Sequence, residues 1–356
     1  MNKGSKGYTL VELMIAVTLG LILTAGVITV FVNTKQGFRL QESAGRMQEN
    51  MRTSIEVLAR TIRQADFWSG VKTNVITGTP AVNAYSIGST CTASWITTVS
   101  SSNVSQGLVG YAGAGSTPID CIASGDYVAS SDMLAVRYAD PNTFRTTGFA
   151  SAPASTQVFL RTFLGVPTGG MKGYLFLGSD VSSADTRIPG SSSVFNYQYR
   201  ASLIFLRPCS VKAGAACAAT DDSGHPIPTL ATLDLQGSSL VQSPLVEGVE
   251  MVRYLYGIDT DGDLVVDLYC TASQIINASG SCTSGWGSVL SVRAGLVVRG
   301  DLVDNFTDRT TYTLPGGFTY GPSSCGGCSA TYSGTVARNQ RRLITKDIQL
   351  RNRTRV

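Results

Sequence analysis

The stretch that decides the fold lies near the start of the chain and reads Lys6-Gly7-Tyr8-Thr9-Leu10-Val11-Glu12-Leu13-Met14-Ile15-Ala16-Val17. From Tyr8 to Thr34 the only charged side chain is Glu12, and the first proline is Pro80. A helix over this mostly apolar segment, at ~1.5 Å per residue, is long enough to cross the ~30 Å hydrocarbon core of a bilayer. A carboxylate inside such a segment costs ~2.5–3.5 kcal/mol on insertion scales, so Glu12 marks a functional position.

This stretch resembles the class III signal of type IV prepilins, in which a dedicated peptidase cuts after a glycine. The resemblance implies that residues 1–7 form a leader peptide, that cleavage falls between Gly7 and Tyr8, and that the new amino group of Tyr8 is methylated. It also implies that Glu12 serves in subunit assembly. A glutamate in lipid needs a positive partner, which the free amine of a neighbouring subunit's first residue would supply. The alternative is a generic signal anchor with a stray glutamate.

Two lysines set the expected orientation in the membrane. Lys3 and Lys6 precede the apolar run, so the positive-inside rule leaves the leader in the cytoplasm and everything after Asn33 outside. The run is too long for a secretory signal peptide, and no small-residue cleavage site closes it. We therefore expect a single-pass protein of the bacterial inner membrane with its head in the periplasm. By resemblance, the protein would later move into a cell-surface pilus.

The apolar pattern continues past the membrane segment and predicts that the same helix runs on. Apolar residues recur in steps of four and three, the spacing of one stripe along an α-helix. The stripe comprises Leu40, Ala44, Met47, Met51, Ile55, Leu58, Ile62 and Ala65. We expect one helix from Tyr8 to about Asp66, roughly 88 Å long, with Gly70 as a stop. Residues 8–34 would lie in lipid or a filament core, and 35–66 would pack on a globular head formed by residues 67–356.

The composition favours a β-rich head. Of the 356 residues 43% are hydrophobic and 15% are charged, so a sizeable core is available, and 38 glycines are typical of loop-rich β structure. Strand-like runs occur at Met133–Tyr138, Gln157–Phe163, Tyr174–Leu177, Ala201–Arg207, Val249–Ile258, Leu264–Tyr269, Val289–Arg299 and Arg341–Leu350. These elements predict an α+β fold, in which the long N-terminal helix packs on an antiparallel β-sheet head with disulfide-closed loops.

Eight cysteines fall into four local pairs, namely Cys91 and Cys121, Cys209 and Cys217, Cys270 and Cys282, and Cys325 and Cys328. An even count in a chain that crosses a membrane indicates an oxidising compartment and disulfides. Eight cysteines allow 105 connectivities, and nearest-neighbour pairing is the leading one. The Cys325-Gly-Gly-Cys328 spacing also occurs in thiol oxidoreductases and zinc half-sites. Because the flanking βαβ pattern and a second such motif are missing, a structural disulfide is the favoured interpretation.

The stretch Asp259-Thr-Asp261-Gly-Asp263-Leu-Val-Val-Asp267 has two interpretations. Alternating aspartates around a glycine let several hard oxygens converge, as calcium loops require, with Asp259, Asp261, Asp263 and Asp267 as ligands. The match to the EF-hand pattern is imperfect, because Leu264 takes the place of the invariant glycine. The favoured alternative is a hairpin turn, since Asp-Gly is a strong turn former.

The C-terminal part narrows the resemblance. Three features are similar to the PilW family of minor pilins, namely an acidic turn after Tyr-Gly-Ile-Asp (Tyr256 to Asp263), Trp286 before an alternating strand, and the ending Leu350-Arg351-Asn352-Arg353. The resemblance implies a structural subunit that primes type IV pilus assembly and sits at or near the tip. Its partners would be the prepilin peptidase, an inner-membrane assembly platform, the major pilin, other minor pilins and a tip adhesin. The runner-up is a minor pseudopilin of a type II secretion system.

The charge of the C-terminal tail and the histidine content bear on two other function classes. From Val336 onwards seven basic residues stand against one acid, so this tail carries +6 and the rest of the +4 chain about −2. Such a tail fits a membrane-anchored DNA-binding module. Its charges alternate with apolar residues as in a strand, so a solvated sheet face is favoured and no nucleic acid is expected. With His225 as the single histidine, no familiar catalytic constellation can be assembled, and we expect no enzyme activity.

Overall fold

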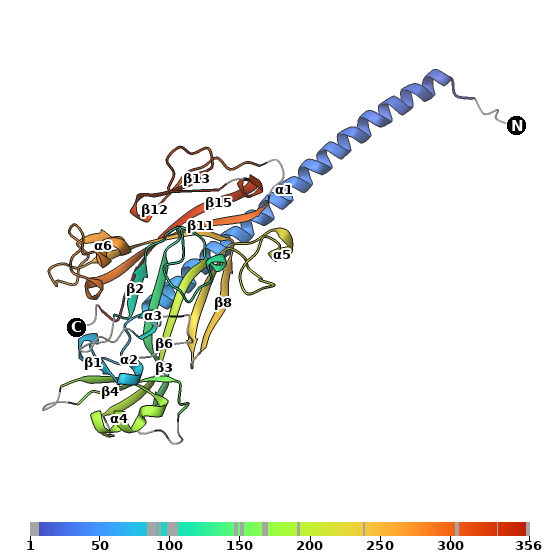
Figure 1. Cartoon of the computed structure of the whole chain (residues 1–356). Helices are drawn as coiled ribbons and strands as arrows, with labels where there is room; N and C mark the ends of the chain where they lie inside the picture. The colour runs from blue at the N-terminus through green and yellow to red at the C-terminus, as the bar shows by residue number, and fades with distance from the viewer. Residues whose placement is uncertain are drawn as a thin grey trace.

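The computed structural model describes residues 7–83, 91, 94–97, 106–145, 149, 153–165, 170–190, 193–237, 239–302, 306–332 and 334–353. A long helix, α1 (Leu10–Gln64), projects with its first half from a β-rich head and packs on that head with its second half (Figure 1). The predicted leader, apart from Gly7, and the basic residue Arg355 lie outside the described residues. The α+β class and the long N-terminal helix are as predicted.

Helix α1 contains 55 residues and is therefore about 82 Å long. It begins where Thr9, in extended backbone conformation, caps the first turn. The first half is exposed along its whole length, and the helix is long and apolar enough to cross a membrane. Gly20, Gly26, Gly37 and Gly45 do not interrupt it.

The predicted apolar stripe faces the head from Ala44 onwards. Met47, Leu58, Ile62 and Ala65 are buried, and Ala44, Met51 and Ile55 are half-buried. Leu40 is 38% exposed, so the stripe meets the head about one turn later than predicted. The helix ends at Gln64, close to the predicted end at about Asp66 and before Gly70. Ala65 turns to an extended backbone conformation and Asp66 takes a positive φ of 58°.

Within the described residues, fifteen strands form three sheets. Their bounds are β1 (Ile76–Gly78), β2 (Leu108–Tyr111), β3 (Met133–Arg145), β4 (Val158–Phe163), β5 (Lys172–Leu177), β6 (Val194–Arg207), β7 (Thr229–Gln236), β8 (Ser239–Glu247), β9 (Val249–Ile258), β10 (Leu268–Cys270), β11 (Val289–Leu302), β12 (Tyr312–Leu314), β13 (Phe318–Pro322), β14 (Ala330–Tyr332) and β15 (Asn339–Gln349). The largest sheet has the order β1-β5-β4-β6-β3-β2, with β7 and β8 added beside β6. The second sheet is β10-β9-β11-β15 and the third is β12-β13-β14.

Short helices connect the strands. They are α2 (Pro80–Asn83), α3 (Ser94–Thr97), α4 (Val181–Arg187), α5 (Asp221–Gly224) and α6 (Ala272–Ile276). Most strand pairs are antiparallel, as predicted, whereas β1 pairs with β5 and β13 with β14 in parallel. The head is therefore a mixed rather than a purely antiparallel structure.

One predicted strand begins later than predicted. The run Leu264–Tyr269 is predicted as a strand, but strand β10 begins only at Leu268, where it pairs with β9. Leu264 has a φ of 67°, in the left-handed region, and donates its amide to the Asp259 carboxylate at 3.0 Å. The acidic turn therefore takes up the first four residues of the predicted strand, because its carboxylates bind the backbone that a strand would have paired.

One hydrophobic core joins α1 to both larger sheets. Leu58 and Ile62 of the helix belong to the same buried cluster as Val136 of β3 and Leu296 of β11. The helix lies close against β11 at Gly300, where an added Cβ would lie 2.6 Å from Ser43 Oγ. The predicted inward-facing set of β11, from Leu290 to Val298 at alternate positions, is buried as expected.

Candidate functional site

The N-terminal end of α1 presents the predicted processing and assembly residues. Gly7 is exposed and Tyr8 is 89% exposed, so the peptide bond between them is accessible. Glu12 lies one turn further on and folds back toward this bond. Its Oε2 accepts hydrogen bonds from the Thr9 amide and the Thr9 hydroxyl, each at 3.0 Å.

Thr9 and Glu12 form a reciprocal capping box. The Glu12 amide donates to Thr9 Oγ1 at 3.3 Å, while the Glu12 carboxylate takes the Thr9 amide in return. This role of Thr9 was not predicted, although the Thr-x-x-Glu spacing of a capping box is present in the sequence. The box holds the carboxylate near residue 8, where cleavage would create a new amine.

The opposite end of α1 is held by the C-terminal residues. Asn352 Nδ2 donates to the carbonyls of Arg63 at 3.1 Å and Ala65 at 2.9 Å, groups that a helix end leaves unpaired. Arg353 forms a buried ion pair with Asp66, whose side chain is 4% exposed, and donates to the Val289 carbonyl at 2.9 Å. We call Asp66, Trp286, Asn352 and Arg353 the helix-end cluster.

The features that suggested a family in the sequence meet at this cluster. Arg353 donates to the Trp286 carbonyl, and the Trp286 ring packs edge-on against Tyr256 with 4.8 Å between the centroids. Asp66 also accepts hydrogen bonds from the Gly107 amide and, at 3.3 Å, from Trp68 Nε1. These contacts fix the C-terminal end of α1 to the head. They involve Tyr256, Trp286, Asn352 and Arg353.

The acidic turn brings three of its four predicted ligands together. Oxygen atoms of Asp259, Asp261 and Asp267 lie within 4.8 Å of one another, whereas Asp263 is outside this group. Each carboxylate also binds the turn itself. Asp259 Oδ1 accepts the Gly262 amide at 2.6 Å, and hydrogen bonds from the Thr260 hydroxyl and amide lower the pKa of Asp267.

These hydrogen bonds agree with the favoured interpretation of a hairpin turn, because the aspartate side chains of the turn accept hydrogen bonds from the turn's own backbone. Convergence of three carboxylates also fits the hard oxygen ligands that calcium prefers. Calcium binding stays a prediction, with Asp259, Asp261 and Asp267 as the side chains that this arrangement offers.

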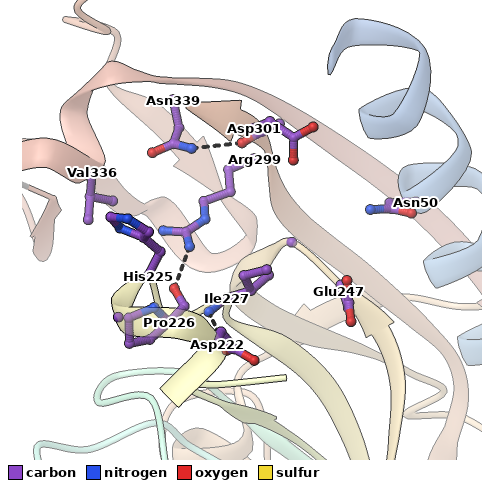
Figure 2. A pocket seen from close by; sticks show the side chains of 13 residues that line it. Asn50, Asp222, His225, Pro226, Ile227, Glu247, Arg299, Asp301, Val336 and Asn339 are labelled. Carbon is purple, nitrogen blue, oxygen red and sulfur yellow. Dashed lines mark hydrogen bonds between the residues drawn. The ribbon is translucent and has the colours of Figure 1, made fainter. Parts of the chain in front are cut away.

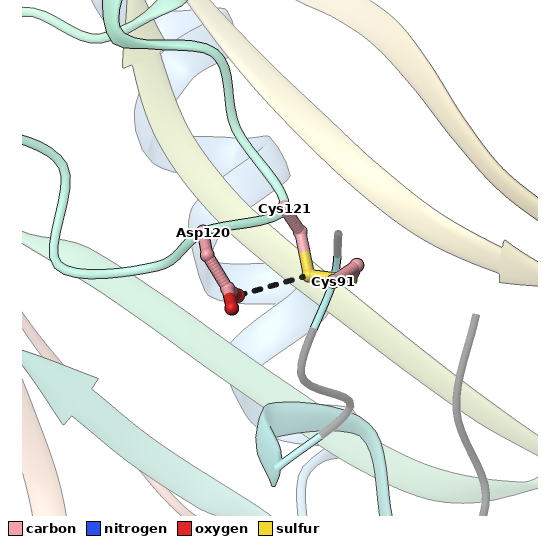
Figure 3. A group of neighbouring side chains, drawn as sticks. All are labelled: Cys91, Asp120 and Cys121. Carbon is pink, nitrogen blue, oxygen red and sulfur yellow. Dashed lines mark hydrogen bonds between the residues drawn. A yellow bond between two sulfur atoms is a disulfide. The ribbon is translucent and has the colours of Figure 1, made fainter. Parts of the chain in front are cut away.

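The cysteines pair as nearest neighbours in sequence, giving Cys91–Cys121, Cys209–Cys217, Cys270–Cys282 and Cys325–Cys328. Figure 3 shows the first pair beside Asp120. The second closes the loop that precedes α5, and the third closes the loop that contains α6. The last pair closes a tight loop after β13, next to Gly321.

The basic tail is not a uniform solvated face, which corrects the sequence interpretation. The Arg341 side chain is completely buried and pairs with Glu250 and, at 3.4 Å, with Asp308. Its guanidinium also lies 3.8 Å from the centre of the Tyr332 ring. Arg353 is buried in the helix-end cluster. Arg342 and Lys346 remain exposed, so the tail offers fewer accessible cations than its sequence suggests.

A cavity of about 380 Å³ lies between α5, the end of β11 and Asn50 of α1 (Figure 2). His225 lies beside Val336 at its edge. The Asp222 carboxylate is already engaged by the backbone amides of Ser210 and Ile227, at 2.8 and 2.9 Å. Among the described residues around this cavity, the histidine and the carboxylate do not form an acid–base pair.

A second and larger cavity, about 960 Å³, lies beside the C-terminal end of α1. We call it the helix-end groove. Its walls are the acidic turn from Asp259 to Leu264 and the loop from Phe67 to Asn74, and Asn352 and Arg353 also line it. The groove therefore joins the acidic turn to the helix-end cluster.

Comparisons with known protein families match both ends of the chain. The family model described as type IV pilus-assembly protein W matches residues 215–352, and the model of the prokaryotic N-terminal methylation motif matches residues 2–28. No curated protein and no solved structure matches the chain. The first region includes Tyr256, the acidic turn, Trp286 and Asn352. The second includes Gly7, Tyr8 and Glu12.

Proposed function

We propose that this chain, a type IV pilin of the PilW family, is a minor pilin that helps to prime filament assembly and lies at or near the pilus tip. The proposal rests on two features that occur together in this chain. An N-terminal methylation motif opens an exposed apolar helix, and a PilW-type head holds the other end of that helix.

The proposed processing uses the accessible bond between Gly7 and Tyr8. The prepilin peptidase cuts there, and the new amine of Tyr8 is then methylated. The carboxylate of Glu12, held near residue 8 by the capping box with Thr9, pairs with the amine of a neighbouring subunit. In lipid or in a filament core this pairing offsets the cost of an isolated charge, so it favours stacked helices over separate ones.

We propose that the protein occupies two locations in turn, first the inner membrane and then the pilus. The chain is first anchored in the inner membrane by α1, with the head in the periplasm, and then leaves the membrane as part of the pilus. Four disulfides in the head support this orientation, because disulfides persist in oxidising compartments. The proposed partners are the prepilin peptidase, the assembly platform, the major pilin, other minor pilins and a tip adhesin.

Deletion of this chain in its native host tests the proposal. Loss of a priming subunit should reduce the number of surface pili while the cellular amount of major pilin stays unchanged. In wild-type cells the chain should occur in sheared pili at a small fraction of the major pilin, measured by quantitative mass spectrometry. Gold-labelled antibody should mark pilus ends. Normal piliation without the chain, together with its absence from sheared pili, would refute the proposal.

A further inference from the structure

The Cys325–Cys328 disulfide is a feature of the head that the proposed function does not use. It joins residues only 3 apart in the sequence, whereas the other disulfides join residues 8, 12 and 30 apart. In the chain-entropy account, a disulfide that closes a shorter loop restrains the unfolded chain less. By this measure the Cys325–Cys328 bond contributes least of the four to the stability of the head.

The surroundings of this disulfide leave it open to a reagent in solution. Cys325 and Cys328 are half-buried, and the two glycines between them are exposed. The second and third disulfides are better protected, because three of their four cysteines are buried, namely Cys209, Cys270 and Cys282.

The first disulfide, Cys91–Cys121, is also half-buried, but a negative charge stands beside it. Cys121 Sγ lies 3.8 Å from the Asp120 carboxylate and accepts a hydrogen bond from Trp95 Nε1 at 3.3 Å (Figure 3). The carboxylate repels an approaching thiolate, and the buried indole covers one side of the sulfur. Exposed disulfides without such barriers are the ones that thiols reduce most readily.

A hydroxyl and a glycine set the chemistry at Cys325 and Cys328. Thr311 Oγ1 donates to Cys325 Sγ at 3.8 Å, and this weak hydrogen bond strengthens when the sulfur becomes a thiolate. Gly321 of β13 leaves room for the pair, since an added Cβ would lie 2.7 Å from Cys328 Sγ. The hydroxyl therefore favours Cys325 as the leaving sulfur when a thiolate attacks Cys328.

The disulfide closes a short connection between two parallel strands. Residues 323–329 alone join β13 to β14, whereas parallel strands usually need a connection of about a dozen residues or more. Strand β14 positions Tyr332, which is 3% exposed and whose ring centre lies 3.8 Å from the buried Arg341 guanidinium. Within the described part of the chain β14 pairs only with β13, so its position depends on this connection.

We propose that the Cys325–Cys328 disulfide is a thiol–disulfide exchange site that a dithiol reduces selectively, and that its reduction releases β14 from β13. A thiolate of the dithiol attacks Cys328 Sγ, the S–S bond breaks, and its electron pair leaves on Cys325 Sγ, which takes a proton. The second thiol of the reductant then displaces Cys328 from the mixed disulfide, and Cys328 also takes a proton. The two cysteines gain two electrons and two protons, and the dithiol becomes a disulfide.

The reductant must be a dithiol, because the reaction with a monothiol is reversed at this site. After attack by a monothiol, the Cys325 thiol lies three residues from the mixed disulfide, at an effective concentration of about millimolar or more, and re-forms the original bond. A second thiol in the same reductant resolves the mixed disulfide first. This inference does not depend on the proposed function, since it concerns a bond within the head.

Stepwise reduction of the full chain in detergent micelles tests the proposal. Samples are treated with dithiothreitol for increasing times and quenched with iodoacetamide, and peptide mass spectrometry follows each cysteine. We expect Cys325 and Cys328 to be alkylated roughly tenfold faster than any other cysteine. Deuterium uptake at residues 330–332 should rise in the same samples, while residues 289–299 of β11 keep their protection. Reduced glutathione at the same thiol concentration should leave the Cys325–Cys328 bond oxidised.

A threonine variant tests the assigned leaving sulfur. Thr311→Val should slow the reduction of the Cys325–Cys328 bond roughly threefold, because the thiolate loses its hydroxyl donor. Thr313→Val is the matched control, since Thr313 is exposed on the neighbouring strand β12, and it should leave the rate unchanged. Equal rates for Thr311→Val and the wild type would overturn the assignment of Cys325.

Two results would overturn the exchange site itself. They are reduction of all four disulfides at one rate and reduction of Cys91–Cys121 before Cys325–Cys328. Full reduction by glutathione at the rate of dithiothreitol would overturn the requirement for a dithiol. Unchanged deuterium uptake at residues 330–332 after both cysteines are alkylated would overturn the release of β14.

Discussion

Substitution of Arg353 by methionine should destabilise the head more than its place near the chain end suggests. The Arg353 and Asp66 side chains are 8% and 4% exposed, and the guanidinium also bonds the carbonyls of Trp286 and Val289. Removing one partner of such a buried pair leaves an uncompensated charge and costs roughly 3–5 kcal/mol. We therefore expect the free energy of unfolding to fall by about 3–5 kcal/mol in Arg353→Met.

Urea unfolding of the full chain in detergent micelles measures this loss. Tryptophan fluorescence is a suitable signal, because Trp68 donates to Asp66 and Trp286 accepts from Arg353. The matched control is Arg293→Met, whose ion pair with Asp347 is 36% and 52% exposed. Solvent screens that pair, so the control should lose only about 0–1 kcal/mol.

A double substitution shows how much of the lost free energy of unfolding comes from leaving the Asp66 charge buried without a partner. Asp66→Asn combined with Arg353→Met removes both charges, so it should be less destabilising than the sum of the two single substitutions. A loss below about 1 kcal/mol for Arg353→Met, equal to the Arg293 control, would refute the reasoning that the C-terminal residues fix the end of α1.

Three further predictions concern the head. The calcium interpretation of the acidic turn predicts a dissociation constant of about 10⁻⁴–10⁻³ M in calorimetric titration, with the heat abolished by Asp261→Asn; no heat at millimolar calcium would leave the hairpin turn alone. Burial raises the pKa of Asp132 above its ordinary 3.8, although Arg253 opposes this. The native state then binds that proton more tightly, so this carboxyl contributes stability below pH 3.8 that is lost as pH rises through the folded pKa. Asp132→Asn should flatten the stability profile there, and an unchanged profile would contradict the shift. Gly107→Ala would place a Cβ 2.4 Å from the Asp66 amide nitrogen, and a loss of about 1–3 kcal/mol is expected in urea unfolding; an unchanged midpoint would contradict this.

Local patterns predicted much of the fold. The helix follows from an uninterrupted apolar run and a stripe in steps of four and three, and both are visible in sequence. The alternation in β11 correctly predicted one buried face, from Leu290 to Val298, although Val289, Ser291 and Val297 on the other face are buried as well. Nearest-neighbour cysteine pairing also agrees with the structure. In each case the deciding interactions are close along the chain or repeat with a fixed period.

Such local patterns could not predict contacts between residues that lie far apart in the sequence. Asp66 and Arg353 are 287 residues apart, and no local spacing links them. Arg341 stands between Gln340 and Arg342 in the basic tail, a polar setting that suggests an exposed side chain, yet it is buried in ion pairs with Glu250 and Asp308. The strand predicted from Leu264 begins only at Leu268, because the Asp259 carboxylate accepts a hydrogen bond from the Leu264 amide in the turn.

The central claim is that Glu12 drives assembly by pairing with a neighbouring subunit's amine, and incorporation of Glu12→Ala into sheared pili tests it most directly. Because this change also breaks the capping box, Thr9→Val is the control that removes the cap hydroxyl, at about 1 kcal/mol, and keeps the carboxylate. We predict that Glu12→Ala is cleaved normally after Gly7 but enters pili poorly, while Thr9→Val enters close to the wild-type level. Wild-type incorporation of Glu12→Ala would contradict the claim.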